Sequence, residues 1–371
     1  MSVLTTNIGG AIAAISVLLL LIFVHELGHF LAAKLQGIRV NRFSIGFGPA
    51  IFSYQGKDTE YAFRLIPLGG YVGFPDDDPD TDIPADDPNL LRNRPILDRA
   101  IVISAGVIAN LVFAYFLLVG QSLTVGFQEM NYQPGVAVPQ IIAESDSAAF
   151  KAGMKAKDII LAVDQLDLEA SPESMTILRE KIQNSPEKPL ELKVKRGEEI
   201  LSLQVTPQRG EDGKGKIGVI LAPNGEIIKY KADNIITGLT AGAKQFENVM
   251  NLTLQGFWQL ISNFSENAGQ VAGPVRIVEV GTNLAKSNAG NLLQFGALIS
   301  INLAIINILP LPALDGGQLA FLAIEGLLGR PLPTKWQESI MQTGLVLLFS
   351  LGFIVIVRDT LNLSVIQELL H

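Results

Sequence analysis

The sequence contains no cysteine and only three histidines among its 371 residues. The lack of cysteine excludes disulfide bonds and thiolate metal sites, so imidazole and carboxylate groups are the metal ligands that remain. Charged residues make up 17% of the chain and hydrophobic residues 48%. This balance is too apolar for an ordinary soluble enzyme and too charged for a chain that lies wholly in a membrane. We therefore expect a membrane core with one water-soluble domain.

Positive charge is absent from the N-terminus. Residues 1–7 contain no Lys or Arg, so they lack the basic region of a secretory signal. The first apolar stretch is therefore predicted to be a retained transmembrane span. The net charge of -8 also argues against nucleic acid as a partner.

Four apolar stretches predict transmembrane helices, since a helix needs about 20 apolar residues to cross a bilayer. The loop between the first two carries eight Lys or Arg residues, and the loop between the last two carries Arg330 and Lys335. By the positive-inside rule, both loops are cytoplasmic. We expect a multi-pass protein of the cell's inner (plasma) membrane, with both termini and the segment between the second and third spans outside the cytoplasm. The predicted spans are about 9–33, 100–123, 292–312 and 338–357.

The first span contains the run His25-Glu26-Leu27-Gly28-His29. On a helix the two histidines lie one turn apart on one face, so their imidazoles can share a metal ion, and Glu26 lies beside them as a base. The alternative is that these are chance polar residues of a buried helix, paired with neighbours. Ionisable groups at membrane depth cost about 2.5 to 3.5 kcal/mol each, which favours a compensating cation.

A catalytic zinc site usually takes three protein ligands, and Asp315 is the candidate for the third. It is an isolated carboxylate that follows the third apolar stretch. The first and third spans both run inward, so Asp315 reaches the same side of the membrane as His25 and His29. By itself, an aspartate before two glycines also fits a turn or a helix N-cap. Buried asparagines in spans most often bond another helix; those noted here are Asn110, Asn302 and Asn307.

The loop between the first two spans contains runs with strand character, at 38–54 and 59–74. They predict a membrane-associated β-hairpin in a cytoplasmic loop of about 38–74, whose edge can pair with an extended substrate. A plain surface hairpin fits equally well. The acidic, proline-rich residues 75–90 predict a solvated, flexible loop.

Residues 134–223 have the pattern of a small α+β domain outside the cytoplasm. Strands are predicted at 136–142, 158–163, 190–194, 201–205 and 216–221, and helices near 146–152 and 172–184. The linker at 224–291 contains an amphipathic helical stretch at 234–264 whose aromatic residues, including Trp258, fit a membrane interface or packing against the domain. Residues 1–133 and 292–371 form the two parts of the membrane core.

With these motifs, the chain resembles the site-2 protease family of intramembrane zinc metalloproteases, and most closely its bacterial branch, the regulator-of-sigma-E proteases. The resemblance covers nearly the whole chain. Its most specific part is the histidine motif together with Leu314-Asp315-Gly316. The other matching segments are 66–72, 105–110, 134–223, Gly273-Pro274-Val275 and 307–317.

The resemblance implies that His25, His29 and Asp315 hold Zn²⁺ and that Glu26 is the catalytic acid and base. It implies that Asn307 helps to hold the substrate or its reacting carbonyl. A membrane-reentrant hairpin at about 60–74 would extend the substrate. It also implies that 134–223 is a circularly permuted PDZ domain, although Lys157 stands where glycine is common. The hairpin residues expected to bind substrate are Pro67, Gly69, Gly70 and Tyr71.

The sequence therefore predicts a polytopic α-helical membrane protein with about four transmembrane helices, a membrane-associated β-hairpin and one extracytoplasmic α+β PDZ-like domain. The expected activity is that of an intramembrane zinc metalloprotease. It would cleave the transmembrane segment of a single-span membrane protein, such as an anti-sigma factor, after an upstream site-1-type protease has acted. Leftover signal peptides are another expected substrate.

Two other classes of function remain open. A catalytically silent PDZ-containing membrane scaffold would bind peptide C-termini, but an intact Glu26 argues against it. A metal transporter would carry acidic or histidine residues along several spans, whereas here they cluster at one depth.

Overall fold

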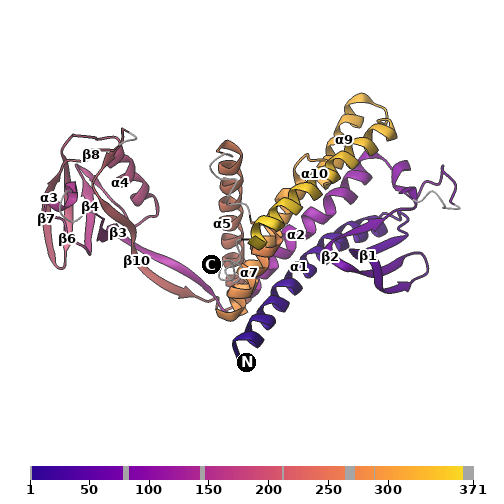
Figure 1. Cartoon of the computed structure of the whole chain (residues 1–371), viewed down its shortest axis with the longest axis horizontal. Coiled ribbons are helices and arrows are strands. Elements are labelled where there is room, and N and C mark those ends of the chain that lie inside the picture. Colours follow the sequence, from indigo (N-terminus) through magenta and orange to yellow (C-terminus); the bar gives the residue numbers. More distant parts are fainter. Residues whose placement is uncertain are drawn as a thin grey trace. The chain divides into compact units, whose positions relative to one another are not determined.

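The computed structural model describes residues 2–77, 83–142, 147–210, 213–263, 272–287 and 289–361. Part of the predicted acidic loop, residues 78–82, therefore lies outside the described residues. The chain divides into two compact units (Figure 1). One comprises Met1–Gly126 together with Lys231–His371, and the other is Phe127–Tyr230.

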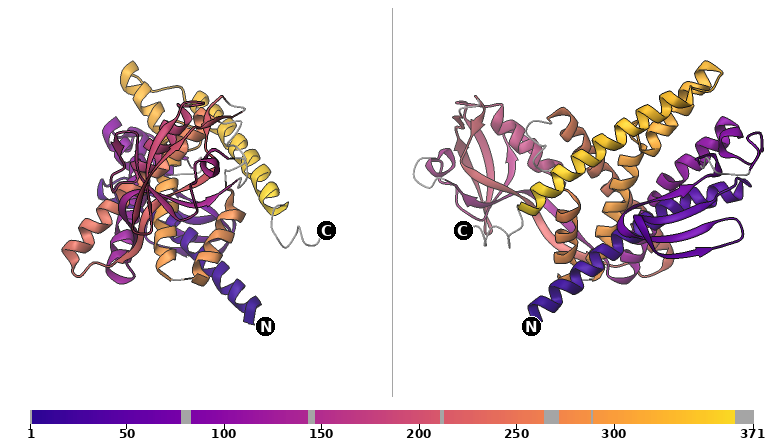
Figure 2. Two further views of the ribbon diagram at one scale, coloured as in Figure 1. Left: turned by 90° about the vertical axis from the view of Figure 1, so that its left-hand side faces the viewer. Right: turned by 45° about the vertical axis from the view of Figure 1, so that its right-hand side comes forward.

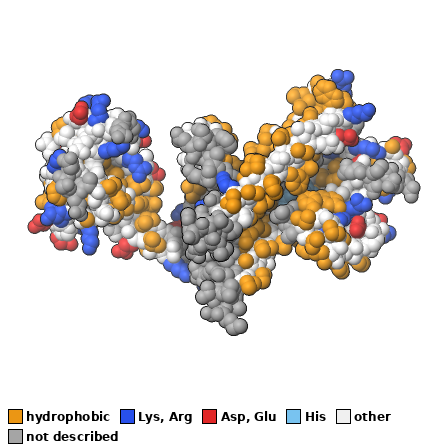
Figure 3. Space-filling model, in the orientation of Figure 1, with side chains coloured by type: hydrophobic (Ala, Val, Ile, Leu, Met, Phe, Trp, Pro, Cys, Tyr) orange, Lys and Arg blue, Asp and Glu red, His pale blue; other side chains and the backbone are white. Residues whose placement is uncertain are grey.

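Four helices of the first unit are long and apolar enough to cross a membrane. They are α1 (Ser2–Leu35), α2 (Ile96–Thr124), α8 (Ala289–Ile308) and α10 (Thr334–Leu361). Their apolar stretches have 28, 29, 19 and 27 residues, against the requirement of about 20. Hydrophobic side chains run along these helices, while charged side chains gather on the other unit and around the connection before α10 (Figure 3).

The predicted third span, 292–312, extends past the helix that the structure has there, since α8 ends at Ile308. Pro310 and Pro312 follow immediately, and proline both lacks a backbone donor and disfavours helical conformation in the residue before it. The chain then forms a turn and enters α9 (Asp315–Leu328), a helix of 14 residues that the sequence analysis did not predict.

Small residues allow the helices of this unit to approach closely. A Cβ on Gly28 of α1 would lie 2.8 Å from Ala109 Cβ of α2, and one on Gly281 would lie 2.8 Å from Ala14 Cβ. Such contacts between small residues are typical of helices that pack in membranes. Gly281 belongs to α7 (Pro274–Ser287), which lies against α1 and α8. The helices α1, α2, α7 and α8 therefore form the packed centre of the unit (Figure 2).

Helix α5 (Ile235–Ser262) packs against α2. A capping box between Asn234 and Thr237 begins the helix, as expected when these side chains satisfy its first amide groups. A Cβ on Gly242 would lie within 3.0 Å of Val119. Trp258, from the predicted aromatic stripe, is 71% exposed, so it is not buried within the described part of the chain.

The hairpin lies within the predicted residues 38–74 and is folded back on itself. It consists of β1 (Arg42–Gln55) and β2 (Glu60–Gly73), which lie beside α1 (Figure 2). Phe43 pairs both with Tyr61 and with Val72, while Tyr54 also pairs with Tyr61. The first residues of β1 therefore lie between two segments of β2, which makes a sheet four segments wide. The segment 70–73 forms one edge of this sheet.

The second unit contains a sheet with strand order β10-β3-β4-β6-β7, and β5 pairs with β4. Its core includes fully buried Val136, Ile160, Leu178 and Leu192. The sequence analysis placed this domain at 134–223, whereas β3 and β10 extend the unit to 127–230. Its elements are β3 (Phe127–Ile141), α3 (Ala148–Lys151), β4 (Asp158–Val163), β5 (Leu166–Asp167), α4 (Glu173–Gln183), β6 (Leu190–Arg196), β7 (Glu199–Val205), β8 (Gln208–Arg209), β9 (Gly215–Lys216) and β10 (Val219–Tyr230).

Lys157 is held in the left-handed region, with φ of 72°. Glycine adopts this conformation without steric cost, whereas other residues lose roughly 1 to 2 kcal/mol. A glycine at position 157 would therefore adopt the same backbone conformation without this cost.

Candidate metal centre

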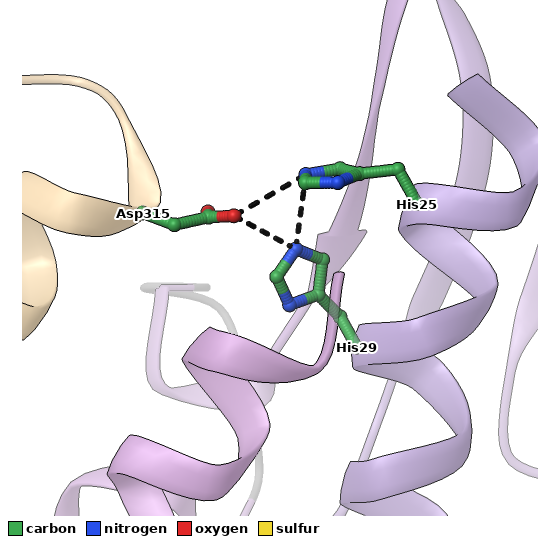
Figure 4. Close-up of side chains that lie close together, drawn as sticks. All are labelled: His25, His29 and Asp315. Atoms are coloured by element: carbon green, nitrogen blue, oxygen red, sulfur yellow. Dashed lines mark hydrogen bonds and ion pairs between the residues drawn. The ribbon is translucent and has the colours of Figure 1, made fainter. Parts of the chain in front are cut away.

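Helix α1 presents His25 and His29 on one face, one turn apart (Figure 4). Their Nε2 atoms are 3.2 Å from each other. His25 is 8% exposed, so the pair lies within the helix packing and not at its surface. The continuous apolar run of α1 forms the helix, and the four-residue spacing brings the imidazoles together.

Asp315 approaches the two imidazoles from the start of α9 (Figure 4). Its Oδ2 atom is 3.3 Å from His25 Nε2 and 3.4 Å from His29 Nε2. The N-cap position of α9 is Leu314, without a side-chain capping bond, so Asp315 does not cap the helix. Its Oδ2 atom is buried and has no hydrogen-bond partner among the described residues.

Glycines after Asp315 allow the turn that places it there. A Cβ on Gly316 would collide with the carbonyl oxygens of Ile308 and Leu309, and one on Gly317 with that of Leu311. Ala313, two residues before Asp315, has a positive φ of 69°. The tight backbone therefore reverses the chain between α8 and α9 and directs the carboxylate toward α1.

The three side chains fit a zinc ion. Four-coordinate zinc is tetrahedral with ligands at about 2.0 to 2.1 Å, which separates ligand atoms by roughly 3.3 to 3.4 Å. The separations among the two Nε2 atoms and Oδ2 are 3.2, 3.3 and 3.4 Å. Two imidazoles and one carboxylate also match a catalytic zinc site, in which a fourth position remains open. The buried, unbonded carboxylate oxygen is explained if it binds a cation.

Helix α2 orients His29 through a backbone group. His29 Nδ1 lies 2.9 Å from the carbonyl oxygen of Val102, to which it can donate its proton. With its proton on Nδ1, His29 has a free lone pair on Nε2, on the side where Asp315 lies. Metal-binding histidines usually donate the proton of their other ring nitrogen in this way. Gly106, one turn further, lets α2 approach, because a Cβ there would collide with the rings of both His29 and His25.

Asn110 of α2 lies beside His25 as Val102 lies beside His29. Its amide nitrogen Nδ2 is 3.2 Å from His25 Nδ1, and the side chain is fully buried, with Oδ1 unpaired among the described residues. If the amide is turned so that Oδ1 faces Nδ1, Oδ1 accepts the ring proton and His25 Nε2 is free for a metal. The Ser300 hydroxyl of α8 donates to the backbone carbonyl oxygen of Asn110 at 2.8 Å. Asn302, in contrast, donates within its own helix, to the backbone carbonyl of Leu298.

Two further predicted residues lie at the centre. Asn307 Nδ2 is 3.2 Å from His25 Nε2, on the side where the ligand atoms converge. Glu26 is 8% exposed and lies against the edge of the sheet, because a Cβ on Gly70 would be 2.7 Å from Glu26 Cγ. The edge segment of β2 thus contacts the predicted acid and base.

The other predicted substrate-binding residues belong to the same sheet. Gly69 has φ of 105°, and a Cβ there would meet the ring of Phe47. Tyr71 stacks on Phe47, with ring centres 6.4 Å apart, and the Arg64 guanidinium lies 5.9 Å from the Tyr71 ring centre. The side chain of Pro67 lies outside the described part of the chain. Among these residues, Gly70 is the one that contacts Glu26.

Sequence reasoning did not identify Val102 or Gly106 as part of the centre. Val102 acts through a backbone carbonyl, which every residue carries, so its side chain gives no signal. Gly106 was noted only within the segment 105–110. Gly106 precedes Asn110 by four residues on α2, so the two lie on one face of the helix. This spacing is the signal that could have linked Gly106 to the site.

Comparisons with known proteins agree with this geometry. A protein of Synechocystis sp. that is named as a zinc metalloprotease is 63% identical over 97% of each chain. A similarly named protein of Nostoc sp. is 57% identical over 95% of this chain and 96% of its own length. The membrane metalloprotease ARASP, chloroplastic, of Arabidopsis thaliana is 46% identical over 96% of this chain and 80% of its own length. The model of peptidase family M50 matches residues 13–351, and the chain accordingly belongs to peptidase family M50.

Proposed function

We propose that this chain, a zinc metalloprotease, hydrolyses a peptide bond within the transmembrane segment of a single-span membrane protein. The observation that carries the proposal is the convergence of His25, His29 and Asp315 beside Glu26, among helices apolar enough to lie in a bilayer. A protease site at this position can reach only bonds that enter the membrane. Membership of family M50 and the named relatives support the hydrolytic chemistry.

In this proposal the two imidazoles and the Asp315 carboxylate hold zinc, while Val102 and Asn110 orient the imidazoles. Zinc bound there would lower the pKa of a water molecule toward about 7 and polarise a carbonyl. Glu26 takes the proton of the attacking water and returns it to the leaving amine. Asn307, 3.2 Å from His25 Nε2, is placed to hold the reacting carbonyl.

Substrate binding uses the edge segment 70–73 of β2. A helical substrate hides its carbonyls in its own hydrogen bonds, and pairing with a strand edge can replace those bonds. Gly70 brings this edge against Glu26, so a strand added there would expose its backbone next to the catalytic carboxylate. The side chains of Ile51, Phe52 and Leu65 are about 60% exposed or more, which supports a sheet in contact with lipid rather than a plain surface hairpin.

The proposed topology follows the charges. The loops before α2 and before α10 would face the cytoplasm of an inner (plasma) membrane, and the unit 127–230 would lie outside. The metal centre, in the last third of α1, then lies toward the cytoplasmic side.

We propose that the unit 127–230 is a PDZ-like domain that limits access by size. A cavity of about 280 Å³ lies between α4 and the chain from β9 to β10. It is lined by Arg179 and Ile182 on one side and Ile217 and Gly218 on the other, which resembles a groove for a peptide end. Substrates would be proteins already cut by an upstream site-1-type protease, such as anti-sigma factors, or leftover signal peptides. The zinc metalloproteases among the chain's relatives argue against the alternative of a catalytically silent scaffold.

Substitution of Glu26 and of Asp315 separates catalysis from metal binding. Glu26→Gln removes the base and keeps every proposed ligand, so cleavage of a single-span substrate should fall about 10²- to 10⁴-fold with zinc retained. Asp315→Asn removes a ligand and should lower the zinc content of the purified protein, measured by mass spectrometry. Each substitution replaces one carboxylate by a neutral amide, so each variant is the control for the other. Unchanged cleavage by Glu26→Gln would mean that Glu26 is not the catalytic base, and full zinc content in Asp315→Asn would mean that another residue completes the centre.

Substitution of Gly70 tests the sheet edge. In Gly70→Ala the added Cβ would lie 2.7 Å from Glu26 Cγ and 2.9 Å from the Ser44 carbonyl oxygen. Cleavage should fall at least about tenfold while zinc remains bound, because a misplacement of about 1 Å near the reacting groups is costly. The matched control is Gly56→Ala, in the connection between β1 and β2, whose Cβ would lie 2.9 Å from the Thr59 carbonyl oxygen and away from this edge. Equal cleavage by the two variants would remove the edge from the proposal.

A fusion tests the topology. A reporter enzyme that is active only outside the cytoplasm, fused after Asn224, should be active in growing cells. The same reporter fused after Gly56, between β1 and β2, should be inactive. The reverse pattern would refute the assignment made from the loop charges.

Deletion of residues 127–230 tests the size limit. Phe127 and Tyr230 are paired residues of β3 and β10, so Gly126 and Lys231 can be joined by a short glycine linker. The shortened protein should cleave an uncut substrate that the full chain leaves intact, as followed by gel analysis of cell extracts. Glu26→Gln in the shortened protein is the control. Continued resistance of the uncut substrate, with normal cleavage of the pre-cut one, would show that the unit does not filter by size.

A further inference from the structure

Glu325 is a buried carboxylate for which the proposed reaction has no use. It lies on α9, ten residues after Asp315, and is only 4% exposed. A buried charge is costly unless it is paired and fully hydrogen-bonded, so the surroundings of Glu325 indicate what it does.

Both oxygens of Glu325 have partners, and these come from different segments. Oε2 lies 2.8 Å from Nη1 of Arg99, in the first turn of α2. Oε1 accepts from the backbone amide of Leu332 at 3.2 Å and from Nε2 of Gln337 at 3.1 Å. One carboxylate therefore connects α2, α9, the α9–α10 connection and the start of α10.

The two helices joined by this ion pair carry different parts of the metal centre. Val102, three residues after Arg99 on α2, accepts the proton of His29 at 2.9 Å. Asp315 is the first residue of α9. The distance between His29 Nε2 and Asp315 Oδ2, 3.4 Å, therefore depends on how α9 is held against α2.

Helix α9 packs directly against α2 and, less extensively, against α8. Helix α10 packs mainly against α7, and its contact with the turn before Asp315 is made by Met341, whose sulfur lies 3.3 Å from the Ala313 amide, and by Gly344, against Pro312. A charged pair at the far end of α9 is thus the main polar tie between the helix that carries the carboxylate and the helix that orients His29.

We propose that Arg99 and Glu325 are positioning residues of the metal centre, whose ion pair fixes α9 on α2 and keeps Asp315 within ligand distance of His25 and His29. This inference rests on the proposed function, because it takes the three side chains as the zinc ligands. It adds a distant electrostatic tie that sets the affinity for zinc.

The experiment measures the zinc dissociation constant of the purified full chain by competition with a chelator, in wild type, Arg99→Gln, Glu325→Gln and the double variant. Glu325→Gln keeps an oxygen for Leu332 and loses the charge that faces Arg99. Each single variant should raise the dissociation constant about 10- to 100-fold, as for other residues that support metal ligands. The double variant should be no weaker than the weaker single variant, because both remove one interaction. Arg99→Lys, which keeps the charge, should recover part of the affinity.

The matched control is the ion pair of Arg94 and Asp98, four residues apart around the start of α2, whose side chains are 23% and 27% exposed. Arg94→Gln and Asp98→Asn should leave zinc affinity within about twofold of wild type, as expected for a pair that water can reach. If a single variant does not fold, the double variant decides, since it leaves neither charge unpaired.

Zinc affinities of Arg99→Gln and Glu325→Gln within about twofold of wild type would overturn the proposal, even with a lowered melting temperature, because the pair would then be structural only. Asp315→Asn, measured in the same assay, distinguishes a failure of the positioning role from a failure of the proposed metal centre. If it loses zinc while the Arg99 and Glu325 variants do not, only the positioning role fails. If it binds zinc as wild type does, the proposed centre itself is wrong.

Discussion

The free-energy cost of placing ionisable side chains among apolar helices governs the arrangement of this protein. His25, Glu26, His29 and Asp315 lie within a bundle whose helices are long and apolar enough for a bilayer. Each such group costs roughly 2.5 to 3.5 kcal/mol at membrane depth. The imidazoles and the carboxylate offset part of that cost by facing one another, an arrangement that also suits a shared cation. The folding of α1, α2, α8 and α9 toward one point produces this arrangement.

Backbone geometry supports the centre more than side-chain packing does. Gly28 and Gly106 allow α2 to approach α1 until a carbonyl of α2 reaches His29. Gly316 and Gly317 allow the turn that brings Asp315 back toward α1. The same principle applies at Gly70, where a strand edge touches Glu26. Small residues let rigid elements come close, and the rigid elements then orient the reacting groups.

Local signals in the sequence predicted part of this arrangement. The spacing of His25 and His29 is a property of a single helix, and Asp315 is conspicuous as a lone carboxylate after an apolar run. The zinc cofactor and the protease class expected from these motifs are confirmed by the family and its named relatives. The four long apolar helices were predicted because hydropathy over 20 residues is also local.

Long-range features could not be predicted in the same way. The pairing of Phe43 with both Tyr61 and Val72 depends on how two strands fold over each other, and neither strand encodes it alone. Helix α9 was missed because 14 residues between prolines are too few for a span and fit a loop. The Val102 carbonyl is a group that every residue carries, and Glu325 meets Arg99 from 226 positions away in the chain, which no local pattern encodes.

The central claim is that two imidazoles from one helix and a carboxylate from another bind a single zinc ion. X-ray absorption at the zinc edge of the purified full chain tests it most directly. The account predicts nitrogen and oxygen neighbours at about 2.0 to 2.1 Å, with the outer-shell scattering of two imidazoles that falls to one in His29→Ala. A zinc shell without imidazole scattering, or one that His29→Ala leaves unchanged, would contradict it.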